Sequence, residues 1–140
     1  MATRSTISKV TKGGVIKTIY CHWDGYVSYN GNLLLKYYRT AKRIDKLLAL
    51  GNLSGLNRRL APHKNELHSF DSPAKDVVIA YGRDRQETGQ EAQLFPRSTT
   101  ADKREPQEYN YIFKGGKWYY SKGSNPTLYL LEKTEEYDDI

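Results

Sequence analysis

Two pairs of adjacent glycines, Gly13-Gly14 and Gly115-Gly116, constrain the fold more than any other feature of this sequence. Each pair separates two segments rich in threonine, isoleucine, valine or aromatic residues: residues 4–10 and 15–23 around the first pair, and residues 109–113 and 117–120 around the second. Such segments are typical of β-strands, and glycine supplies the positive φ angles that tight hairpin turns need. The sequence therefore predicts two β-hairpins, one near each end of the chain.

The segment between the hairpins shows the periodicity of helices. Apolar side chains recur at helical spacing in residues 33–38 and again in residues 44–48. Thr40 is suited to cap the second of these helices, and Gly51 stands where a left-handed residue would end it. Residues 53–60, with leucines at helical spacing, predict a third short helical turn.

The rest of the chain is predicted to add strands and two loops. Residues 62–75 lack periodicity and predict a loop, whereas the apolar run Val77 to Tyr81 is typical of an inner strand. Residues 83–108 are polar and predict a long loop that is mobile or functional. Residues 127–131 predict either a last strand or the start of a helix.

The expected fold class is therefore α+β. We expect an antiparallel sheet of about four or five strands, including the two Gly-Gly hairpins, with short helices from residues 31–60 packed on one face. Residues 1–131 are expected to form a single domain. Residues 132–140 hold five acidic residues and predict a frayed C-terminal tail.

Charge is distributed unevenly along the 140 residues. The net charge is +6, with +9 on residues 1–70 and −3 on residues 71–140. A basic half attracts phosphate-bearing partners by long-range Coulomb forces. A solubilising surface with an acidic tail explains the same pattern equally well.

Nothing in the sequence predicts export or insertion into a membrane. The longest aliphatic run is Leu33-Leu34-Leu35, against about 20 residues needed to span a bilayer. The residues after Met1 include no apolar leader segment. Cys21 is the only cysteine, which excludes an intrachain disulfide and a multi-cysteine zinc site. We expect a cytosolic protein with no membrane partner.

The densest group of chemically versatile side chains is the stretch Cys21-His22-Trp23-Asp24-Gly25-Tyr26 at the end of a predicted strand. Neighbouring strand residues point to opposite faces, so Cys21 and His22 are not expected to form a catalytic dyad. His22 and Asp24 share a face, which would allow the carboxylate to orient the imidazole. A structural role, with Trp23 in the core and Asp24 holding a turn, is the simpler interpretation.

Two further patterns suggest phosphate or base recognition. Arg83 and Arg85 flank Asp84 and could hold a phosphate by bidentate hydrogen bonds, although a solvated loop explains them equally well. Aromatic residues alternate with cations in Lys36-Tyr37-Tyr38-Arg39 and in residues 114–122, as in proteins that stack on single strands, although chance pairing is favoured. The spacing of the histidines and carboxylates predicts no metal site, and no cofactor is expected.

Three stretches, MATRSTI (residues 1–7), IYCHWDGY (residues 19–26) and LALGNLS (residues 48–54), carry a family resemblance. On these residues the chain resembles a group of small proteins from tailed bacteriophages and prophages. The resemblance extends over most of residues 1–120, through Tyr29-Asn30-Gly31, the arginine pair and the second hairpin. It implies a setting in the cytoplasm of the bacterial host, where small non-structural phage proteins commonly block host enzymes or sequester defence signals.

Several functions are compatible with these features. The favoured hypothesis is a phage-encoded counter-defence protein that binds and sequesters a phosphorylated nucleotide-type ligand without turnover. The alternatives are an inhibitor or adaptor that binds a host protein through its acidic tail or loop 83–108, and a basic nucleic-acid-binding protein. An enzyme is least favoured, no catalytic residue is predicted, and a homodimer is the favoured oligomeric state. The residues predicted to bind the ligand are Arg4, Ser5, His22, Trp23, Asp24, Tyr26, Asn30, Arg83 and Arg85.

Overall fold

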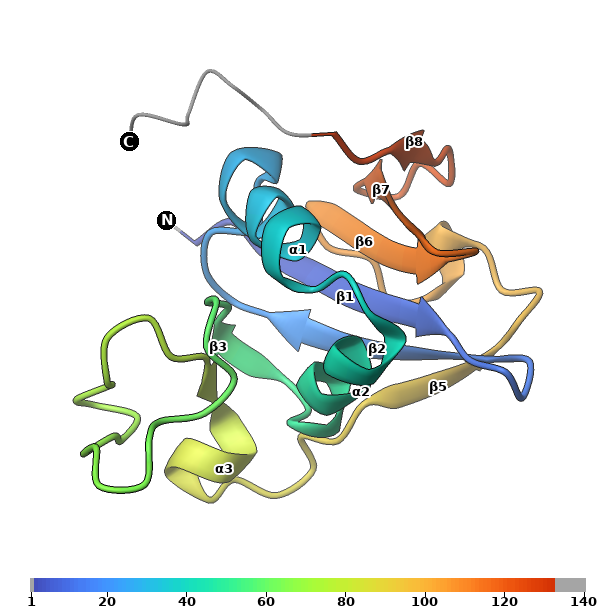
Figure 1. The fold of residues 1–140 in the computed structure, drawn as a ribbon. Helices are drawn as coiled ribbons and strands as arrows, with labels where there is room; N and C mark the ends of the chain where they lie inside the picture. Colours follow the sequence, from blue (N-terminus) through green and yellow to red (C-terminus); the bar gives the residue numbers. More distant parts are fainter. Residues whose placement is uncertain (1, 133–140) are drawn as a thin grey trace.

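The computed structural model describes residues 2–132 and shows an 8-stranded mixed β-sheet with two short helices, α1 and α2, on one of its faces (Figure 1). Within the described residues, no helix is both long and apolar enough to cross a membrane. The elements in chain order are β1 (Ser5–Val10), β2 (Val15–Cys21), the π-helical turn η1 (Val27–Gly31), α1 (Asn32–Tyr37), α2 (Ala41–Ala49), β3 (Leu53–Gly55), β4 (Ile79–Ala80), α3 (Tyr81–Arg85), β5 (Gln93–Pro96), the 3-10 turn η2 (Ala101–Lys103), β6 (Tyr109–Lys114), β7 (Lys117–Lys122) and β8 (Tyr129–Leu130).

Both predicted hairpins are confirmed. β1 pairs antiparallel with β2, and β6 pairs antiparallel with β7. Gly14 in the first turn has φ 75°, and Gly115 and Gly116 in the second have φ 57° and 80°. The glycines therefore occupy the left-handed conformations for which the turns require them.

The α+β class is confirmed, but the prediction of a purely antiparallel sheet of four or five strands is wrong. The strand order is β4-β3-β2-β1-β6-β7-β8, and β5 pairs with β2 beside β3. β1 lies parallel to β6, and β2 lies parallel to β3. The two hairpins are joined through their first strands, so the parallel contact is made between segments about a hundred residues apart, where no local pattern signals it.

Two segments adopt structures other than those predicted. Residues 53–60 form no helix, because Leu53 pairs with Cys21 of β2 and Leu56 is buried in the core. Pairing with a neighbouring strand here overrides the local leucine spacing. The segment 83–108, predicted as a loop, includes the end of α3, strand β5 and turn η2. In the apolar run at 77–81, Val77 and Val78 are buried as expected. The strand of this run, β4, was predicted to be an inner strand but is an edge strand of the sheet.

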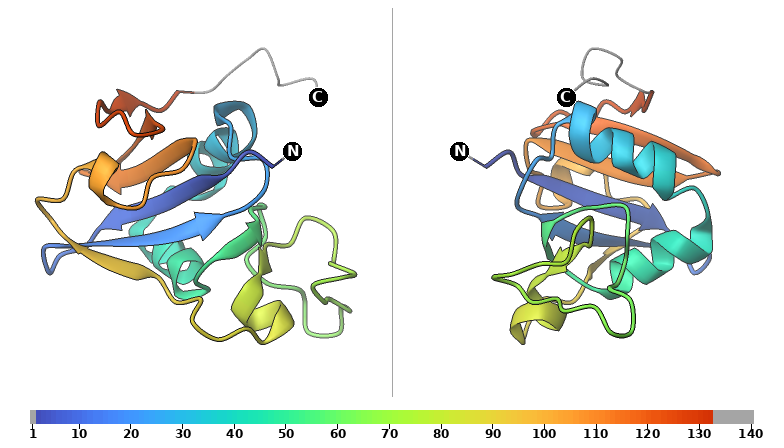
Figure 2. Two further views of the ribbon diagram at one scale, coloured as in Figure 1. Left: turned by 180° about the vertical axis from the view of Figure 1, so that it is seen from behind. Right: turned by 60° about the vertical axis from the view of Figure 1, so that its left-hand side comes forward.

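The helices α1 and α2 cover the apolar face of the sheet (Figure 2). Arg43 donates its backbone N–H to Thr40 Oγ1 at 3.2 Å, which confirms the predicted cap of α2. Ile44, Leu47 and Leu48 of α2 are buried against Ile7, Ile19 and Leu53 of the sheet. Burial of this apolar stripe holds the helical layer in place, since a helix of this length is unstable alone.

Buried tyrosine and tryptophan side chains join the helical layer to the second hairpin. Tyr38 donates its hydroxyl to the carbonyl of Asn57 at 2.6 Å, and its own carbonyl accepts the indole N–H of Trp118 at 2.8 Å. Tyr111 donates its hydroxyl to the carbonyl of Gly25 at 2.6 Å. The rings fill the core while each polar group keeps a partner, as buried aromatic residues require.

Gly51 ends α2 in the predicted left-handed conformation, with φ 77°, and a Cβ atom there would lie 2.2 Å from the carbonyl oxygen of Gln90. We expect Gly51→Ala to lower the free energy of unfolding by at least about 2 kcal/mol, because strain and a backbone clash add. Urea denaturation would measure the loss. The control is Gly55→Ala, where no heavy atom lies within 4 Å of the new Cβ, and its stability should match or slightly exceed the wild type. Equal stability of the Gly51 variant would contradict the close approach of Gln90.

Candidate functional site

The face of the sheet opposite the helices carries buried polar side chains. Because side chains alternate along a strand, Ile7 and Ile19 point to the helices while Thr6 and Thr18 point away. Thr6 donates its hydroxyl to Asn110 Oδ1 at 2.9 Å, and the hydroxyls of Ser8 and Thr18 lie 2.8 Å apart. These side chains are almost fully buried, so the second face is an ordered polar layer and not a solvated surface.

A pocket of about 260 Å³ opens on this polar face. Strand β2 forms its floor, and residues 89–93 and 104–107 form its sides. Its volume lies just under the roughly 300 Å³ at which pockets for drug-sized ligands begin, so it suits a small metabolite. The polar and charged residues lining it are Thr6, Thr18, Tyr20, Asn52, Glu91, Gln93, Arg104, Glu105 and Gln107.

Arg104 is the unusual member of this lining because it is a buried cation. Its residue is 6% exposed, and its Nη1 donates to the carbonyl of Thr99 at 2.7 Å. Burial lowers the pKa of Arg104, and the charge of Asp102 opposes this shift only in part. The ion pairs among residues 2–132 do not include Arg104, since their cationic members are Lys9, Arg58, Arg59, His68, Arg83 and Arg85.

A buried charge that forms no direct ion pair is costly, and proteins normally pair or neutralise it. The guanidinium group has five N–H donors in a planar fork that matches phosphate and carboxylate. Arg104 uses one of them on Thr99, and the residue lines the pocket. The arrangement can therefore accept an anionic group from a ligand.

Two of the residues predicted from sequence, Arg4 and His22, lie beside the pocket wall. The hydroxyl of Tyr20, whose residue lines the pocket, lies 2.7 Å from His22 Nδ1. Burial raises the pKa of Tyr20, and the Arg4 guanidinium next to its hydroxyl opposes the shift. Arg4, Tyr20 and His22 thus form one polar group at the end of β2.

The turn after β2 is held by buried polar contacts. Ser5 and Asn30 are fully buried, and Asn30 Nδ2 donates to Ser5 Oγ and to the carbonyl of Trp23, both at 3.3 Å. A Cβ at Gly25 would lie 2.7 Å from Ser5 Cβ, so only glycine fits this close approach. Ser5 and Asn30, both predicted to bind the ligand, therefore stabilise the turn through buried contacts.

The same turn exposes its aromatic residues. Trp23 is 46% exposed, so the interpretation of Trp23 as a core residue is wrong. Asp24 has φ 56° and accepts a hydrogen bond from the Tyr26 hydroxyl at 3.2 Å. A non-glycine residue in the left-handed region is strained and is found often at binding sites.

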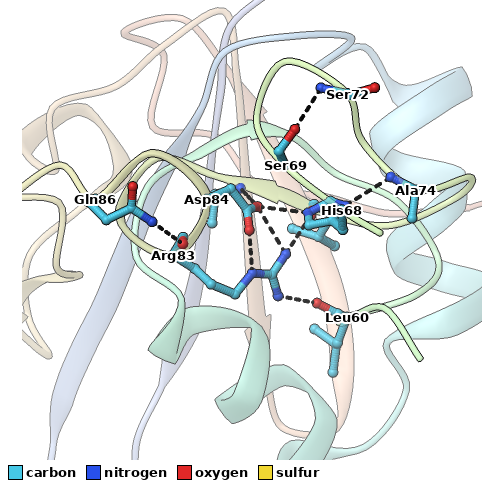
Figure 3. A network of polar contacts seen from close by, with 10 residues as sticks. Leu60, His68, Ser69, Ser72, Ala74, Arg83, Asp84 and Gln86 are labelled. Atoms are coloured by element: carbon cyan, nitrogen blue, oxygen red, sulfur yellow. Dashed lines mark hydrogen bonds and ion pairs between the residues drawn. The ribbon is translucent and has the colours of Figure 1, made fainter. Parts of the chain in front are cut away.

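Arg83 is part of a network that ties the loop of residues 60–78 to α3 (Figure 3). Its Nε donates to Asp84 Oδ1 at 2.8 Å, and its Nη1 and Nη2 donate to the carbonyls of Leu60 and Val78 at 2.6 and 2.7 Å. Because its donors are taken up in this way, Arg83 is suited to hold the loop. As a ligand-binding residue it stays a prediction, and it lies outside the pocket lining.

His68 completes this network from the loop side. Its Nδ1 accepts the backbone N–H of Ala74 at 2.9 Å, which assigns the proton to Nε2, and Nε2 lies 3.1 Å from Asp84 Oδ2. Both side chains are 4% exposed. Burial acts to raise the pKa of Asp84, but hydrogen bonds from Arg83, the Ala80 N–H and His68 outweigh it and lower the pKa overall.

Arg85 is placed differently from Arg83. Its guanidinium carbon lies 4.1 Å from the ring centre of Phe70 and 5.3 Å from that of Tyr81, and it pairs with Glu87. The arginine side chain is 50% exposed. The structure thus separates Arg83 and Arg85 from the pocket lining, while Arg4 and His22 lie next to it.

Sequence reasoning missed Arg104 and Tyr20. The one available signal for Arg104 was its place in the polar segment 83–108, which was predicted to be mobile or functional. Within residues 2–132, no three His, Cys, Asp or Glu side chains come together as a metal site.

Comparison with known proteins gives no further guide to the site. No protein-family model matches the chain, and no match is found among curated proteins or among solved structures.

The Arg83–Asp84–His68 network predicts a pH-dependent loss of stability in Asp84→Asn. A lowered folded pKa means that the carboxylate stabilises the fold fully above the usual aspartate pKa, and that this contribution is lost as the pH falls through the folded pKa. We expect Asp84→Asn to cost about 3 kcal/mol at pH 7, and the difference from wild type to shrink below about pH 4. Urea denaturation across pH 2–7 would measure it.

The matched control is Asp71→Asn, an exposed carboxylate on the same loop. Its effect should stay within about 0.5 kcal/mol at every pH. If the Asp84 and Asp71 variants behaved alike, the network would not be what holds the loop.

Proposed function

We propose that the protein binds and sequesters a small phosphorylated ligand of nucleotide type in the pocket beside Arg104. The single observation that carries the proposal is the buried guanidinium of Arg104, which lines the pocket and takes part in none of the ion pairs among the described residues. A phosphate group would add a direct ion pair through charge-assisted hydrogen bonds, beyond the partial compensation that the charge of Asp102 gives.

The remaining lining residues suit the polar part of such a ligand. Glu91 and Glu105 line the same pocket as Arg104, and carboxylates accept hydrogen bonds from sugar hydroxyls. Asn52 and Gln93 add amide groups that can donate and accept at a base edge. The two acidic residues also disfavour a ligand that is anionic throughout, so the site would select a molecule with one charged end and a neutral, hydroxyl-rich body.

The resemblance to small proteins of tailed bacteriophages supports a setting for this capture. In the cytoplasm of the bacterial host, a protein that holds a nucleotide signal without converting it would weaken a defence that depends on the signal. The alternative, a host protein bound through the acidic tail, stays a prediction, because residues 133–140 lie outside the described residues. Loop 83–108 is partly built into the sheet through β5 and supplies residues 89–93 and 104–107 of the pocket wall, so in this proposal it contributes to a ligand site.

The proposal predicts opposite effects of Arg104→Met on binding and on stability. With the ribonucleoside 5′-monophosphates as probes in isothermal titration calorimetry, we expect at least one to bind the wild type and its affinity to fall about tenfold to a hundredfold in the variant. The unliganded variant should be as stable as the wild type or more stable, because it no longer buries a charge that forms no direct ion pair. Urea denaturation would measure this second effect.

The control is Arg97→Met, which removes an exposed arginine directly after β5 and should change neither nucleotide affinity nor stability. If Arg104→Met destabilised the fold and left nucleotide affinity unchanged, Arg104 would be a structural residue and the proposal would fail. Release of a converted nucleotide product would contradict capture without turnover.

A further inference from the structure

A second surface, separate from the pocket, combines exposed rings with unbalanced positive charge. Trp23 is 46% exposed and Tyr29 is 37% exposed, both on the turn between β2 and α1. Exposed tryptophan and tyrosine rings present flat faces on which other rings can stack. We call Trp23 and Tyr29 the aromatic turn.

Nearly all the charged side chains of the helices that follow the aromatic turn are cations. Asp45 is the only acidic residue in the sequence from residue 25 to residue 65, and it forms an ion pair with Lys9 at 2.6 Å. Its charge is therefore already balanced by a lysine from the sheet. The exposed cations of the helical layer, which we call the basic helices, are Lys36, Arg39, Lys42 and Lys46.

Backbone and side-chain contacts connect the aromatic turn to the basic helices. Trp23 of the aromatic turn donates its backbone N–H to the carbonyl of Ser54 at 3.0 Å, so the segment that leads from β3 to Arg58 begins beside the turn. Asp76 pairs with Arg58 at 2.9 Å, and the carbonyl of Arg58 accepts a hydrogen bond from Arg43 of α2. The loop carrying Arg58 thus bridges the turn and the start of α2, so that the two features belong to one side of the molecule.

We propose that this side of the protein binds single-stranded nucleic acid, with bases stacking on the aromatic turn and phosphates contacting the basic helices. Binding of single strands without sequence preference uses this combination of cations and stacking rings. A duplex keeps its base faces stacked internally, so it can use the cations but not Trp23 and Tyr29. Single strands are therefore expected to bind more tightly than duplexes.

The surface lies mostly on the other side of the sheet from the pocket beside Arg104, and the two approach each other only at Trp23, whose ring centre lies 4.8 Å from that of His22. The helices cover one face of the sheet (Figure 2), whereas the pocket is lined by Thr6 and Thr18, which point to the opposite face. Failure of the nucleotide proposal would leave this one intact, and Arg104→Met should bind an oligonucleotide like the wild type.

The test measures fluorescence anisotropy of a labelled oligothymidylate of about 20 nucleotides with the full chain across a sodium chloride series. We expect Lys42→Gln combined with Lys46→Gln to reduce the magnitude of the log–log salt slope by about 1.4, since each phosphate contact on a single strand contributes about 0.7. Trp23→Ala combined with Tyr29→Ala should weaken binding about tenfold or more and leave the slope unchanged.

The matched control is Lys114→Gln combined with Lys117→Gln. These two exposed lysines are paired across the turn of the second hairpin and, by alternation from Phe113 and Trp118, point to the face opposite the helices. The control changes the net charge by the same amount. Because its lysines lie away from the proposed surface, it should leave the salt slope near the wild-type value. An equal reduction in both lysine pairs would show attraction by net charge alone and would overturn the proposal.

Intrinsic fluorescence gives a second readout that does not depend on a label. Trp118 is 4% exposed, so quenching by oligothymidylate should come from Trp23 and should vanish in Trp23→Phe. Three outcomes would each overturn the proposal: no binding at low salt, unchanged affinity in the aromatic double variant, or equal affinity for a duplex of the same length. Circular dichroism would check that each variant keeps the wild-type fold.

Discussion

The alternation of side chains along the central strands is the constraint on which the rest of this structure depends. In β1 and β2, Ile7 and Ile19 face the helices, whereas Thr6 and Thr18 face away and are just as deeply buried. A single pair of strands thus divides the interior into an apolar layer and a polar layer. The apolar layer holds the fold together by burying the helices, and the polar layer provides the floor of the pocket.

Arg83 of α3 and the buried Arg104 show how arginine side chains serve different roles in this fold. Arg83 has a carboxylate and two carbonyls as partners, and it fixes a loop that has little regular structure of its own. Arg104 has one carbonyl, Thr99, and its residue lines the pocket. The first arrangement is complete within the chain, while the second leaves hydrogen-bonding capacity for another molecule.

The features that the sequence predicted well are those whose cause is local. The glycine pairs determined the hairpin turns, and Thr40 and Gly51 determined the start and end of α2, because each acts through its own backbone. The parallel contact of β1 with β6 is a property of the folded sheet, so no window of neighbouring residues carries it. The leucines of residues 53–60 were misleading for the same reason, since the strand pairing at Leu53 is decided by β2.

Two of the residues predicted to bind a ligand, Arg4 and His22, lie near the pocket because each follows or precedes a strand. His22 and Arg4 come next to the pocket wall because they extend β2 and β1, which are paired from Ser5 to Cys21. Arg104 lies in a segment without periodicity, and its burial depends on how that segment folds over the sheet.

The position of β6 in the chain has a consequence for synthesis on the ribosome. Thr6 and its hydrogen-bonding partner Asn110 are 104 residues apart, so β1 lacks one of its two neighbours until β6 has emerged. An unpaired strand edge can pair with other nascent chains. Synthesis of β6 is thus the step at which the second edge of the central strand becomes protected from such pairing.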